Sequence, residues 1–313
     1  MARERRFRFG VTASGAESPE AWLHSARRAE QLGYSTFVMP EHLHCFPPLS
    51  GMLAAAMATS TLHVGTLTFA NDFWHPLWLA RELAGIDFFS SGRLEIGIGT
   101  GWMYQDYHAG GIELRAPSVR IERLLEAIAV IKGLFQGGEF SFEGQHYTLR
   151  DVELKPQTVR GGHPPLLIGG GGKRMLGIAA READIVGVNS QMTADGRFDT
   201  SRLEPSVFEQ QVAWVQEAAG DRFSSLELNV LVNSVAVTEN REEAAEELAA
   251  YWCNLGFILT ADLLLRSPRA LIGNVEQLVE QLQDMRERYH VSYIVIPQAY
   301  MEAFAPVVAY LTS

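Results

Sequence analysis

The chain has 313 residues, of which 47% are hydrophobic and 20% charged, a composition typical of a globular protein that buries a large core. Its formal net charge of -11 excludes nucleic acid and anionic membranes as general partners, because both require a basic surface. The two cysteines, Cys45 and Cys253, are too few and too far apart for a disulfide framework, and no segment has the length and apolarity of a membrane span, so we expect a cytoplasmic protein.

The first half of the chain alternates between strand patterns and helix patterns. Short apolar runs predict strands beginning near residues 7, 36, 62 and 94, and each run ends in a loop that carries polar or aromatic side chains. Ser18-Pro19-Glu20 combines an N-cap residue, a proline at the first helical position and an acidic first turn, which is typical of a helix start. The helices expected in this half span residues 18–32, 49–59, 77–88 and 120–135.

Residues 137–165 interrupt this alternation. The segment from Phe140 to Leu149 has the pattern of a small hairpin, with a turn in its middle. We interpret 137–165 as an insertion into the fold and not as a separate domain.

The second half resumes the alternation and brings the number of predicted strands to eight. Strands are expected from residue 166 into the glycine run, at 184–189, at 226–237 and at 293–297, and residues 190–206 are polar and irregular, which predicts a mobile loop. The helices expected here span residues 174–182, 207–219, 241–255 and 274–289. Eight strands that alternate with helices predict an α/β fold, a (β/α)8 TIM barrel, whose functional residues lie at the C-terminal strand ends. We expect one domain over residues 1–313.

The run from Leu166 to Lys173, Leu-Leu-Ile-Gly-Gly-Gly-Gly-Lys, joins an apolar strand to a helix through four glycines. Glycines let the chain turn sharply and expose several backbone N–H groups, and the following helix adds the positive end of its dipole. The residues alone allow two interpretations, a phosphate site or a plain turn between a buried strand and a helix.

Six segments occur together in an order and spacing known from one family. They are Pro40-Glu41-His42, Asn71 to Pro76, Ser91 to Trp102, Phe142 to Tyr147, Pro164 to Gly172, and Ile272-Gly273. With these segments the chain resembles the luciferase-like monooxygenase superfamily, in its flavin- or deazaflavin-dependent oxidoreductase branch. The resemblance covers nearly the whole chain.

This resemblance implies a barrel with an insertion, a homodimer, and a cofactor held at the C-terminal mouth of the barrel. In the branch that uses coenzyme F420, strand three ends in a bulge with a cis peptide bond, which the resemblance places between Thr66 and Leu67. The cofactor-binding residues that it implies are Glu41, Thr66, Leu67, Asn71, Thr100, Gly169, Gly170, Gly171, Gly172 and Lys173.

His42 is the expected catalytic residue, because it resembles the histidine that relatives place beside the reactive ring and because imidazole exchanges protons near neutral pH. Glu41 stands where many relatives carry an aspartate, so its contact with the ring is in doubt. The cluster of Glu41, His42, His44 and Cys45 also allows a metal site in principle. We expect no metal, since consecutive strand residues point to opposite faces.

Two tryptophans are expected in the substrate pocket. Trp74 matches a position beside the ring in relatives, although packing against the neighbouring helix explains it equally well. Trp102 replaces the catalytic glutamate of the sugar-phosphate dehydrogenase branch, and an indole is no comparable proton donor. We therefore expect an apolar or aromatic substrate in place of a sugar phosphate.

The function expected from these residues is hydride transfer between coenzyme F420 and a small organic substrate. FMN is the alternative cofactor, in a monooxygenase that uses molecular oxygen, because FMN and F420 share the ribityl phosphate. A protein that binds a flavin or deazaflavin without turnover is a second alternative, and an aldolase or isomerase barrel is a third. The third requires a strand-interior lysine or paired carboxylates, and no lysine falls inside a predicted strand.

Overall fold

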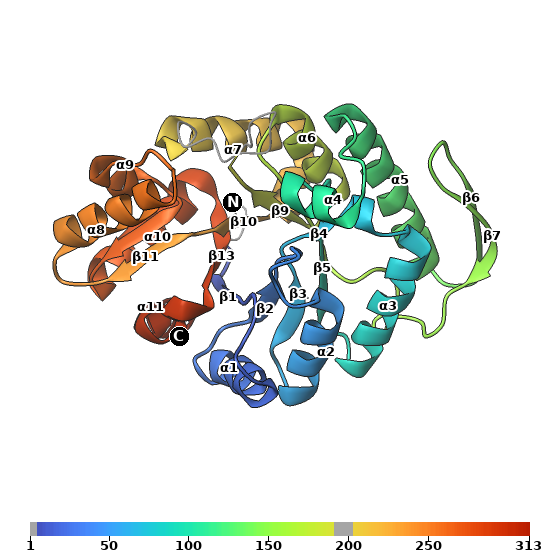
Figure 1. Ribbon diagram of the computed structural model, residues 1–313, viewed down its shortest axis with the longest axis horizontal. Coiled ribbons are helices and arrows are strands. Elements are labelled where there is room, and N and C mark those ends of the chain that lie inside the picture. The colour runs from blue at the N-terminus through green and yellow to red at the C-terminus, as the bar shows by residue number, and fades with distance from the viewer. Residues whose placement is uncertain (1–4, 191–202) are drawn as a thin grey trace. The chain divides into compact units, whose positions relative to one another are not determined.

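The computed structural model describes residues 5–190 and 203–313 (Figure 1). Packing divides the chain into two compact units, each built from segments that are distant in sequence. The first unit contains Met1–Thr12, Arg28–Ser35 and Gly169–Ser313, and the second contains Ala13–Arg27 and Thr36–Ile168. The single domain expected over residues 1–313 stays a prediction.

The second unit is built on parallel strands in which β2 pairs with β3, β3 and β4 pair with β5, and β5 pairs with β8. Helices follow these strands as the sequence predicted, and α4 is an additional short helix. The elements are β2 (Thr36–Met39), α2 (Pro48–Ala58), β3 (His63–Thr66), β4 (Phe69–Ala70), α3 (Pro76–Phe89), β5 (Leu94–Gly99), α4 (Tyr104–Gly110), α5 (Pro117–Phe135) and β8 (Leu166–Gly170).

Two glycines explain how closely β3 and β5 approach each other. A Cβ on Gly65 would lie 2.5 Å from the carbonyl oxygen of Glu95, and a Cβ on Gly97 would overlap the carbonyl oxygen of Thr66. Only glycine fits at either position without moving the neighbouring strand. The hydroxyl of Thr66 then donates to the carbonyl of Gly97 at 2.7 Å.

The cis peptide bond at the end of β3 lies between Leu67 and Thr68, so its predicted position between Thr66 and Leu67 was wrong by one residue. Thr66 is still part of the strand, because it is in register with Met39 of β2. Leu67 N–H also donates to the Met39 carbonyl, at 2.9 Å. The irregular stretch between β3 and β4 therefore begins one residue later than the sequence pattern suggested.

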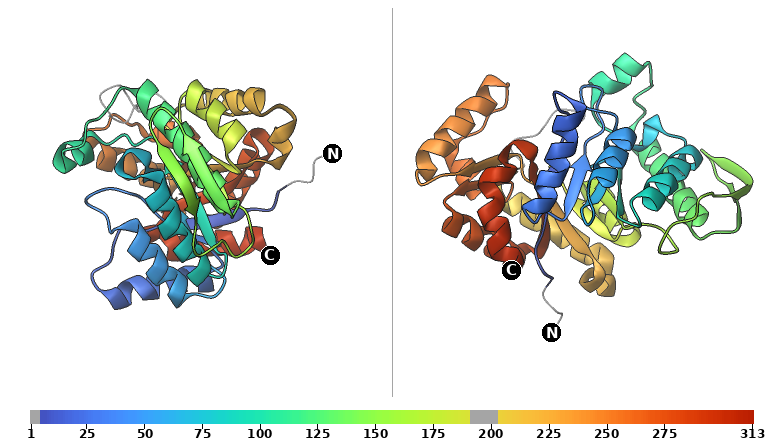
Figure 2. Two further views of the ribbon diagram at one scale, coloured as in Figure 1. Left: turned by 90° about the vertical axis from the view of Figure 1, so that its right-hand side faces the viewer. Right: turned by 90° about the horizontal axis from the view of Figure 1, so that it is seen from below.

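The predicted hairpin is present as the antiparallel pair β6 (Glu139–Glu143) and β7 (Thr148–Glu153). It stands at the edge of the second unit beside α5 and faces the viewer, in light green, in the left view of Figure 2. Its two strands are largely exposed. This is consistent with an insertion that adds little to the core.

The first unit contains the parallel strand order β1-β13-β10-β9. Its elements are β1 (Arg8–Thr12), α6 (Lys173–Glu182), β9 (Ile185–Val188), α7 (Pro205–Ala219), β10 (Glu227–Leu231), β11 (Ser234–Val237), α8 (Arg241–Asn254), α9 (Ala261–Arg266), β12 (Ala270–Gly273), α10 (Val275–Tyr289), β13 (Val291–Pro297) and α11 (Met301–Thr312). Helix α1 (Pro19–Gln31) begins in the second unit and ends in the first.

The single strand predicted over residues 226–237 is instead two strands, β10 and β11. β11 leaves the main sheet and pairs with β12, on which α8 and α9 bury a separate apolar cluster that includes Ala245, Leu264 and Ile272. Apolar alternation continues across both strands, so the local pattern does not reveal the break. Most of the loop predicted at 190–206, residues 191–202, lies outside the described residues. Among those described, no helix is long and apolar enough to cross a bilayer.

Candidate functional site

Glu41 lies just beyond the C-terminal end of β2 and accepts two hydrogen bonds. Its Oε2 accepts from the Ala70 N–H at 2.6 Å and its Oε1 from the Trp74 Nε1–H at 2.7 Å. Burial raises the pKa of Glu41 to about 7, against the effect of the two donated hydrogen bonds, and the negative charge of Asp106 adds to the rise. Glu41 thus connects the ends of β2 and β4 and orients the Trp74 indole.

His42 is held by a carboxylate. Its Nδ1 lies 2.7 Å from Oδ2 of Asp106, and Oδ1 of Asp106 accepts from the Leu43 N–H at 3.2 Å. Because a carboxylate only accepts hydrogen bonds, Nδ1 carries the proton, and Nε2 is left as the nitrogen that can exchange a proton with a ligand. Asp106 is buried, at 5% exposure, whereas the His42 side chain is partly exposed, at 17%.

Aromatic rings surround the His42 imidazole. The ring of His44 stacks on it with centroids 5.3 Å apart, and the Trp102 ring meets it edge-on at 5.5 Å. Trp102 is 39% exposed, which leaves much of its indole open for contact. The structure therefore brings together the predicted residues His42 and Trp102.

Asp106 is the functional residue that the sequence reasoning missed. It is in the first turn of α4, a short helix that was not predicted and that follows the loop after β5. The only signal was its position in the loop after a barrel strand, which also contains Thr100 and Trp102. Its pairing with His42, 64 positions away in sequence, was not visible there.

The side chains of the residues expected in the site after β4 make contacts within the protein. Asn71 is 2% exposed, and its Nδ2 lies 3.4 Å from the Tyr147 hydroxyl. The His75 side chain caps α3 by accepting from the Leu77 N–H, so it stabilises that helix. Trp74 packs edge-on against Phe69 of β4 at 5.9 Å and donates to Glu41, so its expected place in the substrate pocket stays a prediction.

Three further predicted cofactor contacts have side chains that serve the fold. Thr66 is 2% exposed and its hydroxyl is bound to Gly97, while Leu67 is 9% exposed. Thr100 is half-buried, and its carbonyl accepts from the Tyr107 hydroxyl at 3.2 Å. A contact from Thr66 to a cofactor would therefore involve its backbone and not its hydroxyl.

The glycine run lies in the first unit, whereas the residues around His42 lie in the second. Gly170 O accepts from the Asn189 N–H at 2.9 Å, and Gly171 O accepts from Nε2 of Gln211 at 2.7 Å. Neither the Gly171 N–H nor the Gly172 N–H donates a hydrogen bond to another described residue. Gly172 is the N-cap of α6, and no side chain caps this helix end.

The N–H groups of Gly171 and Gly172 are suitable hydrogen-bond donors for a phosphate. Free N–H groups at a helix N-terminus, together with the positive end of the helix dipole, favour an anion. Gly170 is required here because a Cβ on it would lie 2.7 Å from Cβ of Met175, in the first turn of α6. Lys173, predicted to assist, is exposed and pairs with Glu217 at 3.0 Å.

The sequence profile of the luciferase-like monooxygenase family matches residues 6–288. An FMNH2-dependent dimethylsulfone monooxygenase of Pseudomonas putida is 32% identical over 111 residues, which cover 36% of this chain and 31% of that protein. An F420-dependent glucose-6-phosphate dehydrogenase of Microbacterium testaceum is 26% identical over 215 residues, 66% of this chain and 60% of that protein. The chain thus aligns with less than two thirds of the length of either relative.

The structure of a coenzyme F420-dependent tetrahydromethanopterin reductase from Methanopyrus kandleri superposes with a TM-score of 0.80 and 18% sequence identity, over 98% of this chain and 100% of that one. This likeness shows the fold, a closed parallel eight-stranded (β/α)8 barrel. The predicted fold class is confirmed.

Proposed function

Because the chain belongs to the luciferase-like monooxygenase family, we propose that it is an oxidoreductase that transfers a hydride between coenzyme F420 and a small organic substrate. Its relatives include F420-dependent dehydrogenases and FMN-dependent monooxygenases, so a flavin or deazaflavin is the expected type of cofactor. The observation that carries the proposal is the His42–Asp106 pair at the C-terminal end of β2. Such a pair serves a reaction in which a proton moves as the substrate is reduced or oxidised.

The residues of this chain would contribute binding and proton transfer. When bound, F420 supplies the carbon centre that gives or accepts the hydride. Asp106 holds the His42 ring in one orientation and keeps the proton on Nδ1, so Nε2 faces its ligand as a base and, once protonated, as an acid. The N–H groups of Gly171 and Gly172 and the start of α6 would bind the cofactor phosphate.

Trp102 is an argument that the substrate is not a sugar phosphate. Its indole lies against His42, where an acidic side chain would provide a second proton donor, and an indole N–H does not ionise in this range. We therefore propose an apolar or aromatic substrate, bound against Trp102 and Trp74. This distinguishes the chain from its relatives that are named glucose-6-phosphate dehydrogenases.

The second candidate function is an FMN-dependent monooxygenase that uses molecular oxygen. It is favoured by the 32% identity to the dimethylsulfone monooxygenase. A protein that binds a flavin or deazaflavin without turnover is a further alternative. We also propose that the protein works in the cytoplasm as a homodimer.

The cofactor is tested by titrating the cofactor-free protein with F420 and with FMN, followed by fluorescence and by thermal shift. We expect tighter binding of F420, with substrate-dependent oxidation or reduction of F420 and no oxygen consumption in an oxygen electrode. Tighter FMN binding with oxygen consumption would instead establish the monooxygenase. Binding of either cofactor, with no turnover across a broad panel of alcohols, ketones and enones, would favour the binding protein.

A further inference from the structure

Arg269 is a buried cation whose partners are all neutral. It is 6% exposed, and its Nη2 donates to the Val188 carbonyl at 3.2 Å and to Oε1 of Gln211 at 3.0 Å. The guanidinium also lies over the Phe208 ring, 4.8 Å from its centroid. Its Nη1 is buried and finds no hydrogen-bond partner within the described part of the chain. Burial lowers the pKa of Arg269 to about 9.

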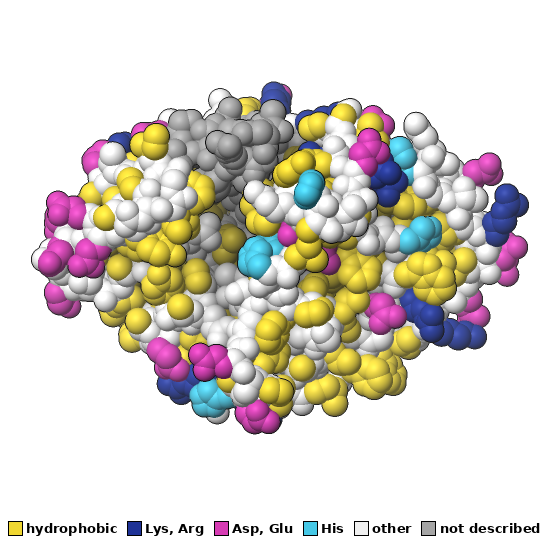
Figure 3. Space-filling model, viewed as in Figure 1, with side chains coloured by type: hydrophobic (Ala, Val, Ile, Leu, Met, Phe, Trp, Pro, Cys, Tyr) yellow, Lys and Arg dark blue, Asp and Glu magenta, His cyan; other side chains and the backbone are white. Residues whose placement is uncertain are grey.

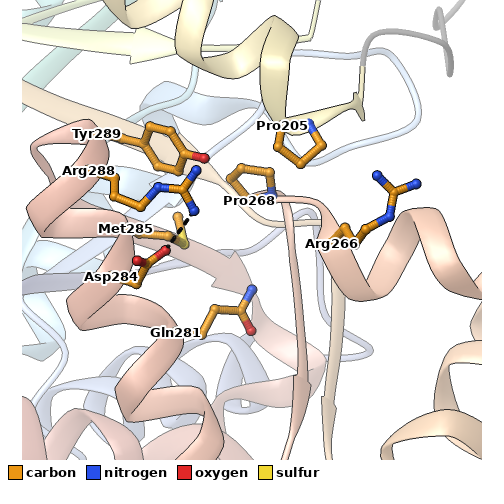
Figure 4. Close-up of a pocket in the computed structure, with 8 residues that line it drawn as sticks. All are labelled: Pro205, Arg266, Pro268, Gln281, Asp284, Met285, Arg288 and Tyr289. Atoms are coloured by element: carbon orange, nitrogen blue, oxygen red, sulfur yellow. Dashed lines mark hydrogen bonds and ion pairs between the residues drawn. The ribbon is translucent and has the colours of Figure 1, made fainter.

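Arginines are usually paired with carboxylates, as are the two arginines that line a nearby surface pocket (Figure 4). There Arg288 pairs with Asp284 and Glu209, and Arg266 pairs with Asp262 and Glu204. Arg269 is the more buried residue and has no carboxylate among the described residues. A buried charge without a counter-charge is costly, so its position calls for an explanation.

Gln211 connects Arg269 to the glycine run. It is 1% exposed, and its Nε2 donates to Gly171 O at 2.7 Å and to Asn189 O at 2.9 Å. The amide cannot turn around, because an arginine only donates hydrogen bonds and so requires Oε1 of Gln211 to face it. Arg269 therefore fixes which end of the Gln211 amide points at the glycines.

The Gln211 amide determines the orientation of one peptide group of the glycine run, and the Asn189 N–H determines that of the neighbouring one. In a trans peptide the C=O and N–H point in opposite directions. Because Gln211 holds the Gly171 carbonyl, the Gly172 N–H points away from Gln211. The Gly171 N–H points away from Asn189 in the same way, because Asn189 holds the Gly170 carbonyl. The hydrogen bonds to the Gly170 and Gly171 carbonyls therefore leave the N–H groups of Gly171 and Gly172 on the opposite side of the loop.

We propose that Arg269 and Gln211 are positioning residues for the phosphate site: they turn the Gly171 carbonyl away from the phosphate and the Gly172 N–H toward it. This inference rests on the proposed function, because it concerns the phosphate of the cofactor. Arg269, which has no carboxylate partner among the described residues, also places a positive charge behind the loop, and this charge favours a bound dianion.

The test compares ligands with and without the phosphate: FMN and riboflavin differ only in this group, and the F420 pair differs in the phosphate and the tail. Wild-type protein and the variants Gln211→Glu, Arg269→Met and Arg269→Lys are titrated with FMN and riboflavin, and with F420 and the same deazaflavin chromophore without its phosphate and tail. In Gln211→Glu one carboxylate oxygen still pairs with Arg269, while the other repels the carbonyls of Gly171 and Asn189. We expect this variant and Arg269→Met to lose at least tenfold in affinity for the phosphate-bearing ligands.

Affinity for the phosphate-free ligands should change less than twofold in these variants, and Arg269→Lys should retain part of the phosphate preference. Ser234→Ala is the matched control. Its buried hydroxyl, in the same unit as Arg269, accepts from the Trp252 Nε1–H at 2.9 Å. It should lose unfolding stability but keep the phosphate preference.

The outcomes separate this inference from the function on which it rests. A wild-type protein that prefers the phosphate-bearing ligands, with variants that keep the same preference, would overturn the positioning role and leave the proposed function intact. Equal wild-type affinity for both ligands of a pair would refute the phosphate site itself and this inference with it. An equal loss of affinity for both ligands of a pair, together with lower unfolding midpoints, would show that Arg269 and Gln211 only stabilise the fold.

Discussion

At the scale of single residues, two carboxylates use both of their oxygens as acceptors at the end of β2. Glu41 accepts hydrogen bonds from the Ala70 N–H and the Trp74 indole N–H. Asp106 accepts hydrogen bonds from the Leu43 N–H and the His42 imidazole. An amide side chain has only one oxygen, so it cannot accept both bonds at either position. Exchange of the acid for its amide is therefore a sharp test of each residue.

For Asp106→Asn we expect the proton of His42 to move from Nδ1 to Nε2. The Leu43 N–H takes the single amide oxygen, because a backbone donor cannot reverse its role, and the amide NH2 then faces Nδ1. The imidazole nitrogen chemical shifts, measured by NMR at a pH where the ring is neutral, report the tautomer directly. Turnover should fall at least about 100-fold, while cofactor affinity stays unchanged.

Asp87→Asn is the matched control for this prediction. Asp87 is also a buried aspartate of the second unit, 3% exposed, and it accepts from the Val159 N–H at 2.8 Å. Its exchange should leave the His42 tautomer as it is. An unchanged tautomer in Asp106→Asn would show that Asp106 does not control the imidazole.

Glu41 should make the stability of the protein depend on pH. Its pKa is raised in the folded chain from about 4.5 to about 7, so the folded state binds more protons than the unfolded state between these values. The contribution of Glu41 is therefore fully present below about pH 4.5 and is lost as the pH rises through 7. Relative to Glu41→Gln, the unfolding free energy of the wild type should fall by up to about 3 kcal/mol from pH 5 to pH 8. Urea unfolding at several pH values measures this, and parallel curves for the two proteins would contradict it.

At the scale of elements, one side chain of α5, Glu126, accepts three backbone hydrogen bonds from the hairpin turn. The N–H groups of Gln145 and His146 donate to the Glu126 carboxylate at 2.8 Å, and the Tyr147 N–H donates at 3.1 Å. Tyr147 in turn contacts Asn71 and packs edge-on against His75, 5.5 Å between centroids. Glu126 thus links an exposed insertion to residues after β4.

For Glu126→Ala we expect local opening of the hairpin turn without global unfolding. Three backbone donors lose a charged acceptor, so hydrogen exchange at Gln145 and His146 should accelerate about tenfold, equivalent to about 1.4 kcal/mol. Burial opposes the ionised form, but the three backbone hydrogen bonds outweigh it and lower the pKa of Glu126. The stabilisation of the hairpin turn by the Glu126 carboxylate, its anchor on α5, is therefore fully present above pH 4.5. It weakens as the pH falls through the lowered pKa of Glu126. Glu122→Ala, an exposed glutamate on the same helix, is the control, and equal exchange rates in both variants would rule out the anchor.

At the scale of the whole molecule, the fold does not decide the cofactor. Relatives that share the family use F420 in one case and FMN in another, so function depends on the site and not on the barrel. In this chain we expect the discriminating features to be side chains at strand ends, above all Trp102, whose ring meets that of His42. Cofactor titration is for this reason more informative than further comparison of folds.

The expected homodimer gives a prediction at this scale. Large apolar side chains are exposed on α2 and α3, which pack together, and hydrophobic atoms gather over these helices in Figure 3. They include Met57 at 64%, Trp78 at 56% and Phe89 at 57% exposure. Such side chains are typical of a covered interface.

We expect the wild type to sediment with twice the mass of one chain, and Trp78→Ser combined with Phe89→Ser to sediment as a monomer. Ile258→Ser, at another exposed apolar residue, 83% exposed, should leave the mass unchanged. A monomeric wild type at micromolar concentration in analytical ultracentrifugation would refute the homodimer. A dimer that survives the double substitution would place its interface elsewhere.

The sequence by itself determined the elements whose cause is local. Apolar runs, proline at helix starts and glycine at strand ends located the eight barrel strands, the main helices and the hairpin, and the position of His42 after β2 marked it as a site residue. The short additions α4, α9 and β12 were missed because their patterns are too brief to stand out. The longer helix α11 (Met301–Thr312), which contains Pro306, was missed as well.

Only the tertiary structure decided which polar groups meet. Asp106 reaches His42 across 64 positions, and Arg269 reaches Gln211 across 58. These pairings depend on the packing of helices and strands that are remote in sequence, and no local pattern encodes them. For the same reason the cis bond was displaced by one residue, because its place depends on where β3 stops pairing with β2.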